Sequence, residues 1–256
     1  MTAAAHDEVS APVATSGGPA AGGGTRRERA RAATTEEIKD TARRLMREQQ
    51  TTDVTLSDIA RAMGMTPPAL YRYFDDRDSL VTALITDAFG ELGAALAAAR
   101  ESVPAADLAG RWLAAASAYR QWASAEPQQF ALILGLPVPG YVAPEEGPTT
   151  EAAQAAMAQL ADLFITALDR GELGPPLVRE VDPSVVMCAK DKDEDFGTAI
   201  PPDSFQAMLH AWSALHGFTS LEAYGHLAWM SEEARDSVFL GQVRLSALAA
   251  GLPVPG

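Results

Sequence analysis

The stretch TLSDIARAMGMTPPALYRYFDDRDSL, residues 55–80, decides the fold class of this chain. Apolar side chains recur every three or four residues in its first part, at Leu56, Ile59, Ala60 and Met63. That spacing predicts a short helix, with Thr55 as its N-cap and Gly64 at the turn that follows. Pro67 and Pro68 then fit the first two positions of another helix, where their missing N–H groups would be unpaired in any case. The stretch therefore predicts two short helices joined by a tight turn.

The helical pattern continues on both sides of this stretch. One helix is predicted from Thr35, and a longer one from near Asp76 to the break at Pro104. Further helices are predicted over residues 105–125, 127–135, 150–170, after Asp182–Pro183, 202–217 and 231–249, with loops over 135–148 and 189–202. No segment shows the period-two alternation of a strand. The fold class is therefore all-α, with a three-helix helix-turn-helix domain over residues 26–80 and a larger helical domain over 81–256.

Residues 1–25 contain almost no large apolar side chains. They cannot offset their ordering entropy by burial, so a disordered tail is predicted there. The basic run TRRERAR, residues 25–31, follows at once and includes Arg26 and Arg27. It has two interpretations: a solvated start to the first helix, or an arm that lies along a phosphate backbone or in a minor groove.

Charge is distributed unevenly along the chain. The formal net charge is -14, which argues against contact with DNA, yet residues 26–80 carry 11 basic and 10 acidic side chains. Exposed charges are screened beyond about 8–10 Å at physiological salt. A distant acidic domain therefore need not stop the N-terminal domain from touching phosphate.

Several classes of protein are disfavoured by what the sequence lacks. The single cysteine, Cys188, permits no internal disulfide and fits a reducing cytoplasm. The four histidines show no metal-binding spacing, and no nucleophile stands beside an evident base, so neither a metal, a cofactor nor an enzymatic activity is expected. No apolar run approaches the roughly 20 residues of a membrane span, and no secretion signal is recognised, so a cytoplasmic protein without membrane contact is expected.

Residues 35–84 resemble the N-terminal DNA-binding domain of the TetR family of transcriptional regulators. The resemblance rests on the Ile-Ala pair of the second helix, on Gly64 in the turn, on LYRYF closing the third helix, and on a basic residue followed by Leu in the fourth. Within the family, PALYRYF, ALILGLPVPGY and AWSALHGFTSLE are similar to a subgroup with a Trp-His-Gly signature, here Trp212, His216 and Gly217.

The resemblance implies a homodimer that places each third helix in a major groove of a roughly palindromic double-stranded DNA operator. It assigns phosphate or base-edge contacts to Tyr71 and Tyr73, and a phosphate contact to Arg77. As the one guanidinium on the third helix, Arg72 is the candidate for guanine readout. The whole predicted DNA-contacting set is Arg26, Arg27, Thr55, Ser57, Thr66, Pro67, Tyr71, Arg72, Tyr73 and Arg77.

Structural alternatives remain open for two of these side chains. Tyr73 has an alternative role in packing against the first helix, and Arg72 has one in pairing with Asp75 or Asp76. The prolines at the start of the third helix remove two backbone donors that would grip an anion. Since Pro68 cannot donate, the Thr66 hydroxyl is expected to cap the N–H of Ala69.

In the family the C-terminal helices form a dimer bundle and enclose a small-molecule pocket. The large side chains of the middle helices predict the pocket lining: Trp112, Tyr119, Trp122, Phe130, Phe164 and Met187. The last two helices supply the predicted dimer interface or core: Leu209, Trp212, His216, Val243 and Leu248. For His216 a packed, hydrogen-bonded role is favoured over direct ligand contact.

The predicted function is a sequence-specific transcriptional regulator, a repressor that a small apolar or aromatic effector releases from its operator. The alternative is a dimeric ligand-binding protein of the same fold that has lost DNA binding.

Overall fold

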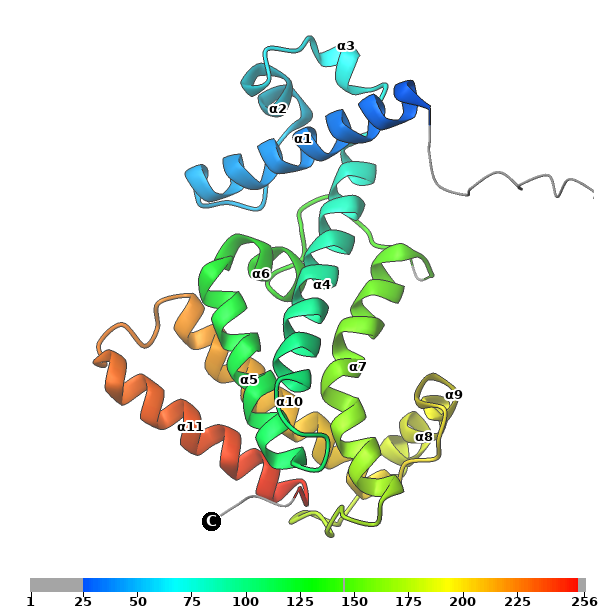
Figure 1. Cartoon of the computed structure of the whole chain (residues 1–256), viewed down its shortest axis with the longest axis vertical. Helices are drawn as coiled ribbons and strands as arrows, with labels where there is room; N and C mark the ends of the chain where they lie inside the picture. Colours follow the sequence, from blue (N-terminus) through cyan, green and yellow to red (C-terminus); the bar gives the residue numbers. More distant parts are fainter. Residues whose placement is uncertain (1–24, 145, 253–256) are drawn as a thin grey trace, which may run out of the picture.

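The computed structural model describes residues 25–144 and 146–252, and within these ranges it contains helices and no β-strand. The helices are arranged as a small N-terminal group above a larger bundle (Figure 1). Their bounds are α1 (Arg26–Gln49), α2 (Leu56–Ala62), α3 (Pro67–Leu70), α4 (Arg77–Glu101), α5 (Leu108–Ala125), α6 (Pro127–Leu134), α7 (Pro148–Asp169), α8 (Pro183–Asp191), α9 (Asp193–Phe196), α10 (Pro202–Ala223) and α11 (Glu232–Ala249). The all-α prediction is confirmed.

Helix α1 begins nine residues earlier than the apolar pattern predicts. Thr25 caps it: the Thr25 hydroxyl accepts the N–H of Glu28 at 3.2 Å, and the Glu28 carboxylate accepts the N–H of Thr25 at 2.6 Å. Residues 26–33 are helical but exposed, and burial begins near Ile38. The basic run is therefore the solvated first part of α1 and not an extended arm. The predicted disordered tail, apart from Thr25, lies outside the described residues.

The helix-turn-helix is formed by α2, a turn at Gly64 and the very short α3. Gly64 has φ 66°, a left-handed conformation that glycine adopts without steric cost. The chain keeps a helical course past Leu70, whose carbonyl accepts the N–H groups of Tyr73 and Phe74. The predicted side-chain cap of α3 is wrong: the N–H of Ala69 is bound by the carbonyl of Thr66 at 2.9 Å, and not by its hydroxyl.

Helix α4 runs from the N-terminal group into the centre of the larger bundle, where it lies beside α5 and α7 (Figure 1). Asp76 caps it by accepting the N–H of Ser79 at 2.7 Å. By length and composition alone α4 could cross a membrane, although Asp87 and Glu91 interrupt its apolar residues. Packing accounts for this composition, because its apolar side chains fill protein cores.

Two apolar cores are arranged along α4. Leu80 and Leu84 belong to the first, with side chains of α1, α2 and α3; Leu92 and Leu96 belong to the second, with α5, α7, α10 and α11. We refer to α1–α3 with the first turns of α4 as the head, and to the rest as the body. Leu132, Val138 and Ala156 of the body also pack into the first core, so head and body are joined by apolar contact.

Two predicted boundaries in the body differ from the structure. Helix α10 continues through Gly217 to Ala223, because Phe218 and Thr219 extend its buried face. The segment predicted as a loop over 189–202 contains the end of α8 and the short α9. There the Phe196 ring packs edge-on against Phe205 at 6.4 Å, which secures the segment.

Candidate nucleic-acid interface and ligand cavity

Five arginines without an ion pair mark one edge of the head. They are Arg26, Arg27, Arg29, Arg31 and Arg72, and we call them the basic edge. All five are exposed, and none forms a salt bridge with any described residue. Arg31 links the two parts of this edge, since its guanidinium lies over the ring of Tyr73, 5.9 Å from the centroid. The exposed start of α1 and the segment after α3 therefore form one surface.

The other basic side chains of the head are all neutralised. Lys39 and Arg43 pair with Asp87, Arg44 with Glu48, Arg47 with Glu126, Arg61 with Asp58, and Arg77 with Asp53. The near-zero charge of residues 26–80 is thus an average over arginines and a lysine that are paired with carboxylates and five exposed arginines that are not. This distribution accounts for how an acidic chain can present positive charge to phosphate.

The side chains around Tyr71 are the most accessible of the predicted set. Tyr71 is 51% exposed, and Arg72 is exposed without the pairing to Asp75 or Asp76 that the sequence allowed. Tyr73 is half-buried and packs against the first core and Arg31 of α1, as its structural alternative predicts. Tyr71 and Arg72 are therefore free to meet a partner, and Tyr73 supports them.

The remaining predicted DNA-contacting residues differ in whether their side chains are free or already bound within the head. Ser57, Thr66 and Pro67 are exposed on the head. The Thr55 hydroxyl is occupied by the N-cap of α2, since it accepts the N–H of Asp58 at 3.1 Å and lies 2.6 Å from its carboxylate. Arg77 donates to Asp53 at 2.7 Å and to the carbonyl of Pro139 at 3.2 Å, so a phosphate contact would require this pair to open.

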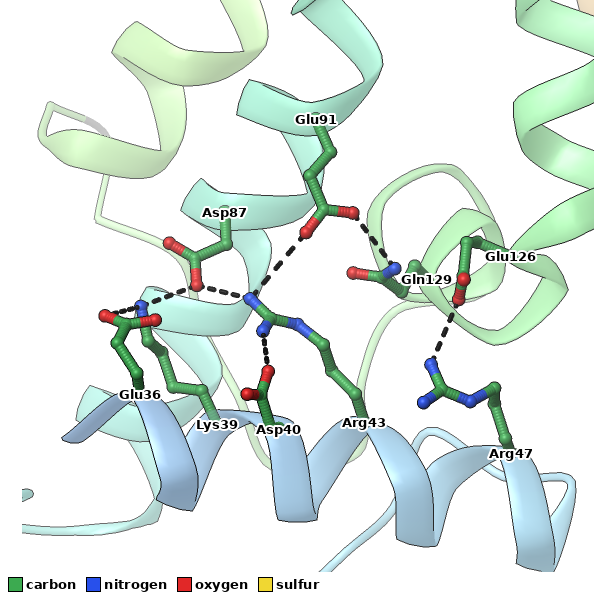
Figure 2. Close-up of polar contacts among 9 residues, drawn as sticks. All are labelled: Glu36, Lys39, Asp40, Arg43, Arg47, Asp87, Glu91, Glu126 and Gln129. Atoms are coloured by element: carbon green, nitrogen blue, oxygen red, sulfur yellow. Dashed lines mark hydrogen bonds and ion pairs between the residues drawn. The ribbon is translucent and has the colours of Figure 1, made fainter. Parts of the chain in front are cut away.

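A charged cluster joins α1 to the body at the junction with α4 and α6 (Figure 2). Asp87 of α4 accepts from Lys39 at 2.7 Å and from Arg43 at 2.5 Å. Although burial opposes it, hydrogen bonds to Asp87 and Glu36 raise the pKa of Lys39. Glu91 of α4 receives the amide of Gln129 from α6 at 3.1 Å. We call Lys39, Arg43, Asp87, Glu91 and Gln129 the junction cluster; it fixes the orientation of α1 on the body.

The body contains an apolar cavity of about 410 Å³ between α5, α7, α9 and α10. Its aromatic lining comprises Trp112, Phe164, Phe196, Phe205 and Trp212. Among the lining side chains only Gln154 and Lys192 are polar or charged. A cavity of this size and character suits a small, largely apolar molecule.

Two of the six predicted pocket residues, Trp112 and Phe164, line this cavity. Tyr119 and Phe130 are instead fully buried in the core, and Trp122 packs against it. Met187 is 66% exposed and does not line the cavity, so its predicted place is wrong. The presence of a large aromatic residue in the sequence could not show whether it lines the cavity or fills the core, because both environments bury the same kind of side chain.

The predicted interface residues are divided among three environments. Leu209 and Trp212 line the cavity. Val243 is buried, and its carbonyl accepts the indole N–H of Trp112 at 3.1 Å. Leu248 is 63% exposed on α11. It belongs to an exposed apolar face that sequence reasoning recognised only in part: Leu221 of α10 and Val238, Leu245 and Leu248 of α11.

His216 is held between α5 and α10 as a packed, hydrogen-bonded residue. Its Nδ1 lies 2.9 Å from the Tyr119 hydroxyl and its Nε2 3.3 Å from the Ser220 hydroxyl. Its ring stacks on Trp212, with centroids 5.5 Å apart. Burial lowers the pKa of His216 and raises that of Tyr119, which favours a neutral imidazole beside a protonated phenol.

The basic edge and the junction cluster contain candidate site residues that the sequence analysis did not name. The basic run that contains Arg29 and Arg31 was recognised as either a solvated helix start or an arm, but only Arg26 and Arg27 were named as DNA contacts. The Thr25–Glu28 capping box was a readable signal for the earlier start. The pairing of Lys39 and Arg43 with Asp87 had no local signal, since the residues are far apart in sequence.

Comparison with known proteins identifies both parts of the chain. Residues 38–84 match the family model described as bacterial regulatory proteins, tetR family, and residues 112–244 match the tetracyclin repressor-like C-terminal domain. The chain is 30% identical over 210 residues to the HTH-type transcriptional regulator Rv1816 of Mycobacterium tuberculosis (strain H37Rv), an alignment that covers 82% of this chain and 88% of the relative.

Solved structures agree with this assignment. The crystal structure of regulatory protein SCO4313 is 35% identical, covers 87% of this chain and 98% of that chain, and has a TM-score of 0.69. A tetR family transcription regulator from Shewanella sp. PV-4, at 18% identity, shares the fold with a TM-score of 0.53 over 82% of this chain and 96% of that chain. The Trp-His-Gly subgroup stays a prediction. From the matched domains and the full-length relative, we conclude that the chain belongs to the TetR family of transcriptional regulators.

Proposed function

We propose that the protein is a homodimeric repressor that binds a roughly palindromic operator and leaves it when a small apolar or aromatic effector enters the body cavity. The basic edge is the observation that supports DNA binding. The arginines without an ion pair gather beside exposed Tyr71, whereas every other basic side chain of the head is neutralised.

In the proposed complex Tyr71 and Arg72 face the major groove, with Arg72 donating to a guanine. The arginines at the start of α1 lie along the phosphate backbone and fix the register without reading sequence. Ser57, Thr66 and Pro67 border this surface, and Tyr73 supports it from behind. Arg77 and Thr55, which are already engaged within the head, contribute less to binding than the basic edge.

The proposal that a small effector binds in the body is supported by the residues that line the cavity. Aromatic rings on several sides fit a flat or compact apolar molecule, and Gln154 offers an amide for one polar group. The effector acts by binding better to a conformation whose heads are wrongly spaced for DNA, and it lowers operator affinity by its difference in affinity for the two states.

The homodimer rests on the exposed apolar face of α10 and α11. Singly scattered apolar side chains are normal on a surface, but Val238, Leu245 and Leu248 share one helix and Leu221 lies on its neighbour. A two-fold axis through this face would pair the heads over two half-sites about one helical turn apart. The relatives, which are named as transcriptional regulators, do not favour a ligand-binding protein without DNA affinity.

The test is selection of bound sequences from random and genomic duplexes at about 0.15 M salt, an ionic strength at which weak surface electrostatics are already screened. Enrichment of one palindromic site is expected. Arg72→Ala should cost about 1–3 kcal/mol and relax the preference at one base pair, because a bidentate contact is lost. Tyr71→Ala should also weaken binding.

Arg61→Ala is the matched control, since that arginine is an exposed head side chain already paired with Asp58. It should leave the selected site unchanged. If folded wild-type protein enriches no sequence, or if Arg61→Ala and Arg72→Ala weaken binding equally, the proposed interface is wrong.

A further inference from the structure

A chain of contacts leads from the wall of the cavity to the junction cluster. Trp212 lines the cavity and stacks on His216 with ring planes within 13° of parallel. His216 lies 5.7 Å, centroid to centroid, from the ring of Phe130 on α6, which is fully buried. The residue before it, Gln129, is also buried and belongs to the junction cluster. One helix, α6, therefore touches both the support of the cavity wall and the contacts that hold α1.

Gln129 and Arg43 meet at the same carboxylate. Glu91 Oε2 accepts the amide of Gln129 at 3.1 Å, and Glu91 Oε1 lies 3.9 Å from Arg43 Nη2 (Figure 2). Within the described residues, Arg43 Nε and Gln129 Oε1 are both buried without a hydrogen-bond partner. A buried polar atom without a partner is costly. An unsatisfied donor and an unsatisfied acceptor thus belong to one cluster and are available to pair with each other.

We propose that Gln129 is the positioning residue that couples the body cavity to the head. In the present arrangement the Gln129 amide binds Glu91, and Arg43 holds α1 on Asp87. When the cavity is filled, displacement of Trp212 passes through His216 and Phe130 to α6. The carbonyl of Gln129 then accepts from Arg43 Nε, and α1 changes its position on α4. This inference rests on the proposed function for its biological meaning, but its geometry does not require DNA.

Among the described residues, the contacts that Arg47 and Arg77 make between head and body include no unsatisfied atom of this kind. Arg47 pairs with Glu126 at 3.2 Å, near the surface, and Arg77 is bound by both Asp53 and the Pro139 carbonyl. These contacts hold the head in place. Gln129 differs because its amide group can serve Glu91 through its nitrogen and Arg43 through its oxygen.

The test fills the cavity by substitution and measures the position of the head by spin-label distances. Ala161→Phe, from the cavity lining, stands in for a ligand, and Ala158→Leu provides a smaller filler if the first variant does not fold. Labels are attached at Ser57→Cys in the head and Gln121→Cys in the body, in a Cys188→Ser background. Labelled protein is diluted with unlabelled protein so that only distances within one chain are recorded.

Three results are expected. The filler shifts the distance distribution when Gln129 is present. Gln129→Met, which keeps the side-chain volume and removes the polar group, abolishes that shift. Gln129→Glu shifts the distribution without any filler, because the introduced carboxylate repels Glu91 and attracts Arg43. The same changes at Gln128, the neighbour on α6, should leave the response to the filler intact; a merely structural role for Gln129 would not give opposite effects of Met and Glu.

The proposal is overturned if the filler moves the head equally with Gln129→Met, if both fillers leave the head unmoved, or if Gln129→Glu causes no shift. Operator binding gives a separate readout: the filler should weaken affinity about tenfold in otherwise wild-type protein and less than twofold with Gln129→Met. If selection finds no operator, the proposed function fails while the distance measurement still decides the coupling.

Discussion

Arginine has two opposite uses in the head, and the neighbouring residue decides which applies. Arg44 is neutralised by Glu48 one turn away, whereas Arg27 stands on an exposed helix start without an ion pair. An arginine that already has a carboxylate partner offers phosphate little net charge. Composition alone could not separate these uses, because the head contains nearly equal numbers of acids and bases.

This distinction predicts a difference in salt dependence. Arg27→Ala should lower affinity for all duplexes about equally and reduce the slope of log K against log salt by about 1, since one phosphate contact is lost. Arg44→Ala should leave the slope unchanged. Fluorescence anisotropy titrations between about 0.05 and 0.2 M salt measure both. An equal loss of slope in the two variants would contradict the assignment of the basic edge.

His216 predicts how stability depends on pH. Burial lowers its pKa below the ordinary 6.5, so the unfolded state binds a proton that the folded state resists as pH falls through that value. The free energy of unfolding should therefore fall below about pH 6.5, by at most about 1.4 kcal/mol per pH unit from this one group.

His216→Gln should remove that part of the pH dependence, measured by urea unfolding at about pH 7.5 and 5.5. The same change at exposed His226 is the control. If the fall in stability is as steep with His216→Gln as in wild type, another group is responsible.

Substitutions at two glycines of α4 can distinguish the effect of helix propensity on stability from the effect of packing between helices. A Cβ at Gly90 would meet nothing within 4 Å, whereas a Cβ at Gly93 would lie 3.2 Å from the Cα of Ala156 on α7. Gly90→Ala should raise the free energy of unfolding by up to about 1 kcal/mol, the helix preference of alanine over glycine. Gly93→Val should lower it by about 1–3 kcal/mol, because α4 and α7 would be forced apart.

Urea unfolding measures both glycine variants. Gly90→Val is the control that keeps the β-branched side chain but lacks the clash. Equal destabilisation by valine at the two positions would show that propensity, and not the contact with α7, controls this crossing.

The helices were largely predictable from sequence because their apolar spacing and caps are local. Gly64, the prolines of α3 and the start of α4 near Asp76 all occur where the pattern predicts them. The start of α1 was left undecided between the basic run and Thr35, because apolar spacing begins only where burial begins. The cavity lining depends on how α5, α7 and α10 come together, so Phe196 and Phe205 could not be distinguished from core residues before the fold was known.

At the scale of the whole molecule, the proposed dimer face makes a prediction about assembly. Leu245→Glu should give a monomer, because a charge placed in an apolar interface cannot be solvated there. The residue is 59% exposed within one chain, so the fold should persist. Sedimentation analysis measures the mass, and circular dichroism the helix content. Leu136→Glu, at an 88% exposed loop position, is the control and should remain dimeric. A dimer that survives Leu245→Glu would place the interface elsewhere.

Helix α4 also limits how this protein can be recombined with its relatives. The predicted domain boundary at residue 80 falls near the beginning of the helix, and Leu80, Leu84, Leu92 and Leu96 fill two cores in succession. A hybrid joined at that boundary would mix side chains of two parents in the first core, whose members lie on both sides of residue 80, while the second core lies wholly after it. The head therefore cannot be exchanged between relatives independently of the body. A working hybrid would have to take α4, Leu132, Val138 and Ala156 from the parent that supplies α1–α3. Under the proposed function, the operator contacts and much of the effector-binding body would then come from one parent.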